Sequence, residues 1–246
     1  MTESTRLIVD RGDPRDAGAW DQRLRSDGAI AQRNQTLELQ QITELVVKRA
    51  ILGGARGVAL TGSTARAKRT TISDLDYHVV GNRPEVRDLP ADVDIYESPP
   101  EKMRAKLVQG DDFVQWTLCC GCILYDTGVF REAASTIVQR DLWPNGESKL
   151  QRLPELRCLA ERLIGVRDRD AAQDQVRAAL TSAARGVLLQ RGVFALARSE
   201  LPAQLRLVNA DILADSLEAA IYAEPTLETL ASMLEAVVAL ELVSAS

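Results

Sequence analysis

The segment between Gly57 and Val80 constrains the fold of this chain more than any other part of the sequence. A short apolar run, residues 58–60, ends in Thr-Gly-Ser, and a polar, basic stretch follows it. An Asp-Leu-Asp sequence then leads into a second apolar run that ends at Val80. Apolar runs of this length, bounded by turn residues, are typical of buried strands. The segment therefore predicts a strand, a turn with a short helix, and a second strand.

The polar residues of this segment suit the binding of a phosphate and a metal ion. Gly62 permits a turn that a side chain would obstruct, and it lets the backbone approach a phosphate closely. Ser63 adds a hydroxyl at the start of the next turn, where free N–H groups suit an anion. Asp74 and Asp76 lie two residues apart, so in a strand both carboxylates face the same side, about 7 Å apart at their Cα atoms. Two hard oxygen ligands beside a phosphate cradle are what a magnesium–nucleotide site needs.

This combination resembles a known signature. Gly62-Ser63, ten further residues and then Asp74-Leu75-Asp76 resemble the motif of the DNA polymerase beta-type nucleotidyltransferase superfamily. Thr64-Ala65-Arg66 is similar to the pattern that follows Gly-Ser in its minimal, antibiotic-modifying and toxin–antitoxin branches. That superfamily has a third carboxylate on a neighbouring strand, and Asp94, between two apolar residues, matches it. The resemblance is specific over about residues 57–97 and much weaker beyond them.

The resemblance implies Mg²⁺-dependent nucleotidyl transfer. Asp74, Asp76 and Asp94 would be the catalytic residues and the ligands of a two-ion magnesium site. Gly62, Ser63 and Arg66 would bind the nucleoside triphosphate, for which ATP is the expected identity. Asp94 would also help to deprotonate an acceptor hydroxyl, whose attack at the α-phosphorus expels pyrophosphate.

The acceptor is left open, and three functions are weighed. A small catalytic domain with an all-helical partner resembles the antibiotic nucleotidyltransferases, which favours a small hydroxylated acceptor such as an aminoglycoside. The first alternative is transfer of AMP to a protein partner or an RNA end in a toxin–antitoxin-like system. The second is a non-catalytic nucleotide-binding regulatory protein. Neither the preferred nucleotide nor the oligomeric state follows from the sequence.

Composition limits the class of protein. The 246 residues suffice for one large or two small domains. The formal net charge of −5 disfavours binding of extended nucleic acid, which normally requires a basic excess. No apolar run approaches the roughly 18 residues of a transmembrane helix, and the first residues lack the apolar core of a signal peptide. We therefore expect a cytoplasmic protein without a membrane partner.

The cysteines argue against a zinc site or a disulfide framework. Three of the four crowd into positions 119–122, the fourth is Cys158, and no C-x-x-C pair is matched by a second one. Reduced, packed thiols are the favoured interpretation.

The rest of the chain separates into a strand-containing half and a helical half. We expect an irregular or short helical lead-in over residues 1–27, anchored by Trp20, and a helix from about 29 to 52 that ends at Gly53. Further strands are predicted at about 93–97 and 121–126, with helices between and after them. Beyond residue 148 the strand signals disappear, and helices are predicted at about 148–166, 170–191, 200–222 and 226–243. The predicted fold is α+β, with a small mixed-sheet nucleotidyltransferase domain at 1–146 followed by an all-α helical bundle at 147–246.

Several charged residues have both a structural and a functional interpretation. Asp92 shares the strand face of Asp94, and Asp94 is favoured as the metal ligand. The only histidine, His78, shares the face of the paired acids, where the family usually has an apolar residue; a structural histidine is favoured over a base. Lys68 and Arg69 are interpreted as solvated.

Two basic residues near the start of the helical half are also ambiguous. Lys149 and Arg157 stand where related enzymes often place a cation over the outer phosphates. Because no motif covers them, they are interpreted as solvated surface charges.

Overall fold

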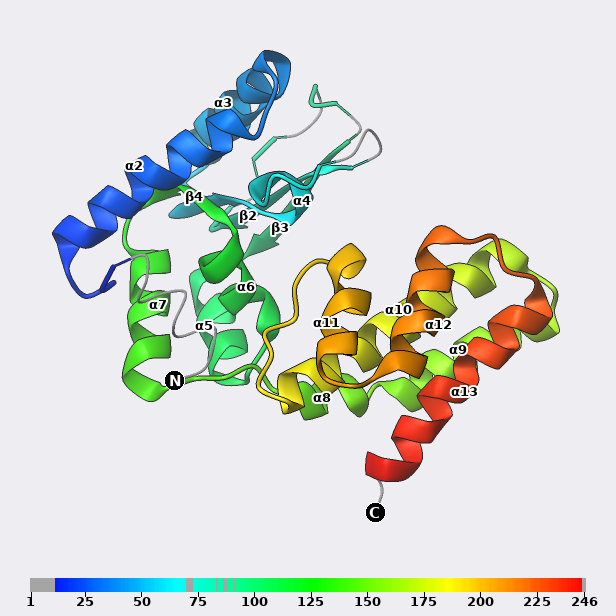
Figure 1. Ribbon diagram of the computed structural model, residues 1–246. Coiled ribbons are helices and arrows are strands. Elements are labelled where there is room, and N and C mark those ends of the chain that lie inside the picture. The colour runs from blue at the N-terminus through cyan, green and yellow to red at the C-terminus, as the bar shows by residue number, and fades with distance from the viewer. Residues whose placement is uncertain (1–11, 70–72, 83, 86–87, 91, 245–246) are drawn as a thin grey trace. The chain divides into compact units, whose positions relative to one another are not determined.

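A computed structural model describes residues 12–69, 73–82, 84–85, 88–90 and 92–244. The chain divides into two compact units, residues 1–144 and 145–246. In the described residues of the first unit, a four-stranded sheet is packed with helices, whereas those of the second are helical without a strand (Figure 1). The predicted fold class, a small mixed sheet followed by a helical region, is confirmed.

The sheet has the order β3-β2-β1-β4. Its strands are β1 (Gly57–Leu60), β2 (Leu75–Val80), β3 (Val93–Ser98) and β4 (Cys122–Asp126). β1 pairs antiparallel with both β2 and β4, whereas β2 pairs parallel with β3. All four residues of β1 are buried, as its uninterrupted apolar sequence predicts for a central strand. The parallel pairing places the amino ends of β2 and β3 side by side.

Two helices precede the sheet, where the sequence predicted an irregular or short helical lead-in over residues 1–27 and one helix from about 29 to 52. They are α2 (Ala17–Arg33) and α3 (Leu37–Leu52), so a helix is present in the lead-in, residues 1–11 of which lie outside the described residues, but the predicted boundary near residue 29 was wrong. The cause is local capping: the Asp16 side chain accepts from the Gly18 N–H at the start of α2, and the Thr36 hydroxyl accepts from the Leu39 N–H at the start of α3. α3 ends at Gly53 as predicted.

The predicted anchor in α2 is confirmed. Trp20 is buried, and its indole N–H donates to Oδ2 of Asp126 at 3.0 Å. Asp27 of the same helix is also buried; it accepts from the Ile123 N–H at 3.0 Å and pairs with Arg23. These contacts bind α2 to β4.

Helices cover both faces of the sheet (Figure 1). On one face, Val46 and Ala50 of α3 belong to a core cluster with Leu75, Tyr77 and Val79 of β2. The opposite face lies against α5 (Pro100–Val108), α6 (Asp112–Cys120) and α7 (Val129–Arg140). Because side chains alternate along β2, Tyr77 faces the first layer and its neighbours Asp76 and His78 face the second.

The second unit is built around one long helix. It contains α8 (Gly146–Leu150), α9 (Leu153–Gly165), α10 (Arg169–Gln190), the 3₁₀ turn η1 (Arg198–Glu200), α11 (Leu201–Leu207), α12 (Asp211–Tyr222) and α13 (Leu227–Ser244). The buried alanine and leucine stripe of α10 forms the centre of its core. The single helix predicted at 200–222 is wrong, because Asn209 takes a left-handed backbone conformation (φ +56°) between α11 and α12. The helix predicted at 148–166 is likewise divided into α8 and α9.

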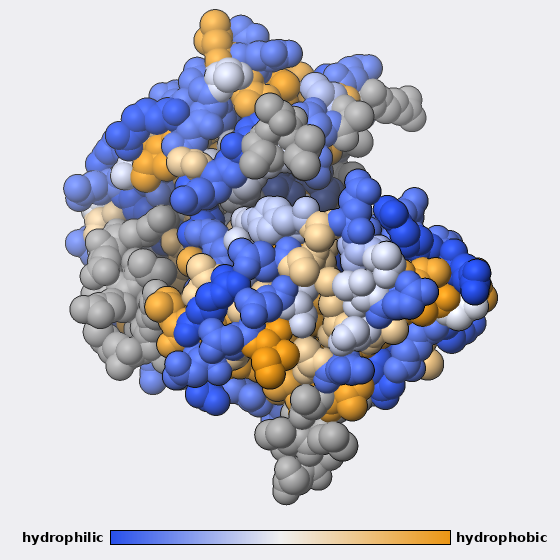
Figure 2. Space-filling view, turned by 45° about the vertical axis from the view of Figure 1, so that its right-hand side comes forward, coloured by the Kyte–Doolittle hydropathy of each residue, from blue (hydrophilic) through white to orange (hydrophobic). Residues whose placement is uncertain are grey.

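The surface and the cysteines carry few special features. In the view of Figure 2 the surface is mainly hydrophilic, with hydrophobic residues in separate patches. Among the helices described, none is both long and apolar enough to cross a membrane. Cys119, Cys120 and Cys122 are buried, Cys158 is exposed, and none of the four forms a disulfide.

Candidate functional site

The three candidate carboxylates lie at the amino ends of β2 and β3. The register of the parallel pair sets Asp76 directly beside Asp94. Asp74 immediately precedes β2 and lies two residues before Asp76, which puts it on the same face. Asp74 and Asp94 are exposed, and Asp76 is half-buried. The fold therefore gathers at one sheet edge the acids that are separated by up to twenty positions in the sequence.

The Gly-Ser turn packs directly against the middle carboxylate. The Thr61 N–H donates to the Asp76 carbonyl at 2.8 Å, which joins the end of β1 to β2. Gly62 then takes a left-handed conformation (φ +67°), and a Cβ added there would lie 1.9 Å from Oδ2 of Asp76. Only glycine fits this position without displacing the carboxylate. The short helix α4 (Gly62–Ala65), which contains Ser63, starts at this contact.

The environment of Asp76 disfavours its negative charge. Burial, together with the negative charges of Asp94 and Asp74, raises the pKa of Asp76 to about 6, and the positive charge of Arg69 opposes the rise. These carboxylates repel one another, and a hard divalent cation bound by their oxygen atoms would relieve the repulsion.

The protein side chains alone do not form a preformed metal site. Among the described residues, no group of three His, Cys, Asp or Glu side chains is placed to hold a metal ion. The donor atoms that Asp74, Asp76 and Asp94 present are carboxylate oxygens, which Mg²⁺ prefers, and Mg²⁺ commonly binds through one or two carboxylates together with water and substrate phosphates. These residues would hold a magnesium ion that enters with its nucleotide.

The raised pKa predicts that Asp76→Asn stabilises the magnesium-free protein at neutral pH. The native state holds the Asp76 proton more tightly than the unfolded chain, whose reference pKa is 3.8. Protonated Asp76 therefore makes its full contribution to the free energy of unfolding below about pH 4, and this contribution is lost as the pH rises through about 6. The difference between the two pKa values corresponds to about 3 kcal/mol of unfolding free energy. Because the carboxylate is partly exposed, solvent screening reduces the expected effect to roughly 1–2 kcal/mol.

Urea unfolding of parent and Asp76→Asn, without divalent ions, measures this effect at a series of pH values between 4 and 8. The difference in unfolding free energy between the two proteins should grow in favour of the variant between pH 4 and 6 and then level off. A difference that does not change with pH would contradict the environment assigned to Asp76.

Arg69 is the site residue that sequence reasoning missed. Its guanidinium donates to the Thr64 hydroxyl at 3.4 Å and to the Asp74 carbonyl at 3.0 Å, and it pairs with Oδ2 of Asp92 at 3.2 Å. It thus joins α4, the start of β2 and the chain before β3. The interpretation of Arg69 as simply solvated was wrong, because its partners come together only in the folded chain. This pairing also separates Asp92, which faces Arg69, from Asp94, which lies beside Asp76.

Arg66 has a different environment from the one its motif position suggested. It is half-buried, and its guanidinium donates to Sγ of Cys120 at 3.4 Å. This contact turns part of the group toward α6. Lys68, by contrast, is exposed as expected.

His78 is a core residue. It is fully buried, its Nε2 lies 2.8 Å from the Ser98 hydroxyl and its Nδ1 lies 3.2 Å from the Thr117 hydroxyl. Its ring packs against the rings of Phe113 and Phe130. Burial, with a smaller contribution from the Lys106 charge, lowers the pKa of His78 to about 3. The imidazole therefore stays neutral at physiological pH, which agrees with the structural interpretation.

Each of the two basic residues named above makes a contact within the helical unit. Arg157 forms an ion pair with Glu161, one turn along α9, and the Lys149 carbonyl accepts from the Ser182 hydroxyl at 3.0 Å. Both lie in the second unit.

Comparison with known proteins gives little further information. The sequence matches no model of a known protein family, and no curated protein matches it. Among solved structures, the chain is similar to a nucleotidyltransferase-like protein from Exiguobacterium sibiricum 255-15, with 17% identity and a TM-score of 0.42. The similarity covers 83% of this chain and 75% of that chain. A likeness this weak carries no conclusion about activity, so the function has to be argued from the site.

Proposed function

We propose that this protein is a Mg²⁺-dependent nucleotidyltransferase that moves a nucleoside monophosphate from a triphosphate, ATP in the first instance, to a hydroxyl group. The observation that carries the proposal is the contact of Gly62 with the Asp76 carboxylate, which itself lies beside Asp94. Because Gly62 has no side chain, the turn packs directly against the Asp76 carboxylate, so a phosphate bound by the backbone of this turn would lie next to the acids. The proposal places the reaction in the cytoplasm.

The residues of the sheet edge would divide the work of binding and chemistry. Asp74 and Asp76 would hold Mg²⁺, with Asp94 as a further ligand. The bound metal would neutralise the triphosphate and the charge that develops during transfer. The Gly62-Ser63 turn would approach the phosphates through its backbone.

The other side chains would position and activate the reactants. Asp94, exposed beside Asp76, would accept the proton of the acceptor hydroxyl. The acceptor oxygen would form a bond to the α-phosphorus as the bond to the leaving pyrophosphate breaks. Arg69 would hold α4 and the amino end of β2 in place, while the positive charge of Arg66 would help to bind the phosphates.

For the acceptor, we propose a small hydroxylated molecule of the aminoglycoside type. The support is the resemblance of the motif to antibiotic-modifying enzymes and the acidic net charge of −5, which disfavours an RNA acceptor. Transfer to a protein side chain is the alternative.

The test is transfer of label from α-³²P-labelled nucleoside triphosphates by the full-length protein with Mg²⁺. Each of the four triphosphates is offered with a panel of aminoglycosides, with bulk RNA, or with the protein alone. We expect pyrophosphate release together with label on a small hydroxylated acceptor, identified by mass spectrometry. Label on RNA or protein would replace the proposed acceptor. Tight Mg²⁺–nucleotide binding without pyrophosphate release under any condition would favour a nucleotide-binding regulator instead.

A further inference from the structure

A cavity lies between α2 and α3, and none of the three candidate carboxylates lines it. This α2–α3 pocket has a volume of about 430 Å³ and is lined by Gly28, Ala31, Gln32, Gln35, Gln40, Thr43, Glu44, Val47, Lys48, Ile51, Leu52 and Leu124. That volume is within the range of small-molecule sites. The pocket belongs to the helical layer that Tyr77 faces, whereas Asp76 faces the other layer. It is therefore a separate site that does not depend on the proposed transfer reaction.

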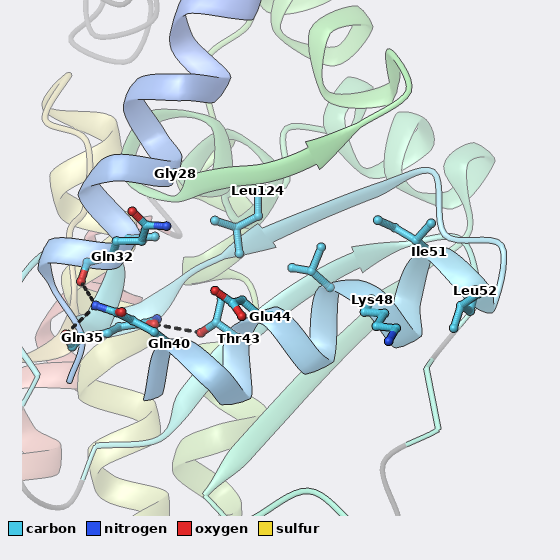
Figure 3. A pocket seen from close by; sticks show the side chains of 12 residues that line it. Gly28, Gln32, Gln35, Gln40, Thr43, Glu44, Lys48, Ile51, Leu52 and Leu124 are labelled. Atoms are coloured by element: carbon cyan, nitrogen blue, oxygen red, sulfur yellow. Dashed lines mark hydrogen bonds between the residues drawn. The ribbon is translucent and has the colours of Figure 1, made fainter. Parts of the chain in front are cut away.

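The shape of the pocket follows one face of α3. Its lining residues recur from Gln40 to Leu52 at the spacing of a single helix face, a length of about 18 Å along the axis. Figure 3 shows Gln35 near one end, Ile51 and Leu52 at the other, and Leu124 of β4 facing α3 from the opposite wall. The walls toward the Leu52 end are mainly aliphatic. This geometry suits a narrow, elongated apolar molecule.

The polar end of the pocket carries an amide with unused hydrogen-bonding capacity. The Gln35 side chain is 9% exposed, and its Oε1 lies 2.9 Å from the Thr43 hydroxyl, which also lies 2.9 Å from the Leu39 carbonyl. Its Nε2 has no hydrogen-bond partner among the described residues. A buried amide donor left without a partner costs free energy, and an acceptor atom on a ligand would recover it.

The neighbouring polar groups do not compete for that role. The Gln40 amide donates to the carbonyls of Gln32 and Gln35, and the Thr43 hydroxyl also lies 2.7 Å from the Tyr77 hydroxyl. These bonds hold the Gln35 end in one arrangement. A ligand therefore meets the Gln35 amide at one end of a channel whose walls combine the aliphatic side chains of Val47, Ile51 and Leu124 with the charged side chains of Glu44 and Lys48.

We propose that the α2–α3 pocket binds an aliphatic acyl compound, with its carbonyl or carboxylate oxygen at the Gln35 amide and its chain along α3. The head group supplies the acceptor that Gln35 Nε2 lacks. The chain covers the apolar surfaces of Val47, Ile51 and Leu124.

The probes are decanoate, which has an acceptor head, and decylammonium, which has the same chain and only donors. Both are titrated below their micellar concentrations into the ¹⁵N-labelled full-length protein, and amide shifts are followed by two-dimensional NMR. Decanoate should bind saturably, shift the Gln35 side-chain amide signals and bind at least about tenfold more tightly than decylammonium.

Two variants test the site against matched controls. Val47→Phe fills the channel and should abolish decanoate binding, whereas Leu45→Phe introduces the same side chain on α3 outside the pocket and should not. Gln35→Met removes the amide and should weaken binding about tenfold, whereas Gln41→Met, on the exposed side of α3, should leave it unchanged. Circular dichroism and thermal unfolding establish that each variant is folded.

The proposal is overturned if decanoate fails to saturate, if both probes bind equally, or if Val47→Phe binds like the parent. Because the readout is binding at α2 and α3, these outcomes are independent of whether nucleotidyl transfer is observed.

Discussion

Asp76→Asn should lower the rate of nucleotidyl transfer on the order of 10³-fold while leaving the protein folded. Asparagine has nearly the same shape as aspartate, so the contact with Gly62 is retained. The charge that would hold Mg²⁺ and the triphosphate is removed, and losses of this size are typical when an electrostatic contact to the reacting phosphate is deleted. Asp74→Asn should act in the same direction. The measurement is steady-state pyrophosphate release, with calorimetric titration of Mg²⁺–ATP in parallel.

Two controls give this prediction its specificity. Asp88→Asn changes an acid whose side chain is 83% exposed and pairs with Arg49, and it should leave transfer unchanged. Asp92→Asn and Asp94→Asn form a matched pair: the first should cost little, because Asp92 faces Arg69, and the second should cost about as much as Asp76→Asn. If Asp76→Asn turns over like the parent protein, the active site lies elsewhere.

Gly62→Ala should reduce transfer by about a hundredfold or more and also destabilise the protein. The added methyl would meet Oδ2 of Asp76 at 1.9 Å, so the carboxylate has to move. Displacement of a reacting group by about 1 Å can cost about a hundredfold in rate. The left-handed backbone at Gly62 adds about 1–2 kcal/mol of strain to the folded state.

Gly192→Ala separates the two contributions. Gly192 also has a left-handed conformation (φ +72°), but no atom lies within 4 Å of an added Cβ. This variant should therefore lose about 1–2 kcal/mol of stability, measured by urea unfolding, with unchanged transfer. If Gly62→Ala loses no more activity than Gly192→Ala, close approach to Asp76 has no catalytic importance.

The local structure around the candidate carboxylates was largely predictable because its signals are local. A glycine followed by serine after an apolar run specifies a turn, and the period of two along a strand puts Asp74 and Asp76 on one face. The limits of β3, predicted at about 93–97 and observed at Val93–Ser98, were predicted closely for the same reason. The helix limits were predicted wrongly where a helix begins at a single capping residue, as at Thr36, or ends at a residue with a left-handed backbone conformation, as at Asn209.

Other features depended on contacts between residues distant in sequence. Asp92 and Asp94 share a strand face, so only the register of β2 with β3 decides that Asp94 lies beside Asp76. Arg69 looked no different from Lys68 until Thr64, Asp74 and Asp92 were brought around it. The α2–α3 pocket depends on how two helices pack, which no local pattern specifies.

The sequence by itself determined the chemistry of the site edge: a glycine turn, a pair of carboxylates with a third on a nearby strand, and a helical second half. Turn formation and strand alternation are short-range effects, so neighbouring residues suffice to specify them. Only the tertiary structure decided how these groups meet. Burial and pairing of the strands raise the pKa of Asp76 and make His78 a neutral core residue, because desolvation and charge–charge repulsion depend on distances between residues far apart in the chain.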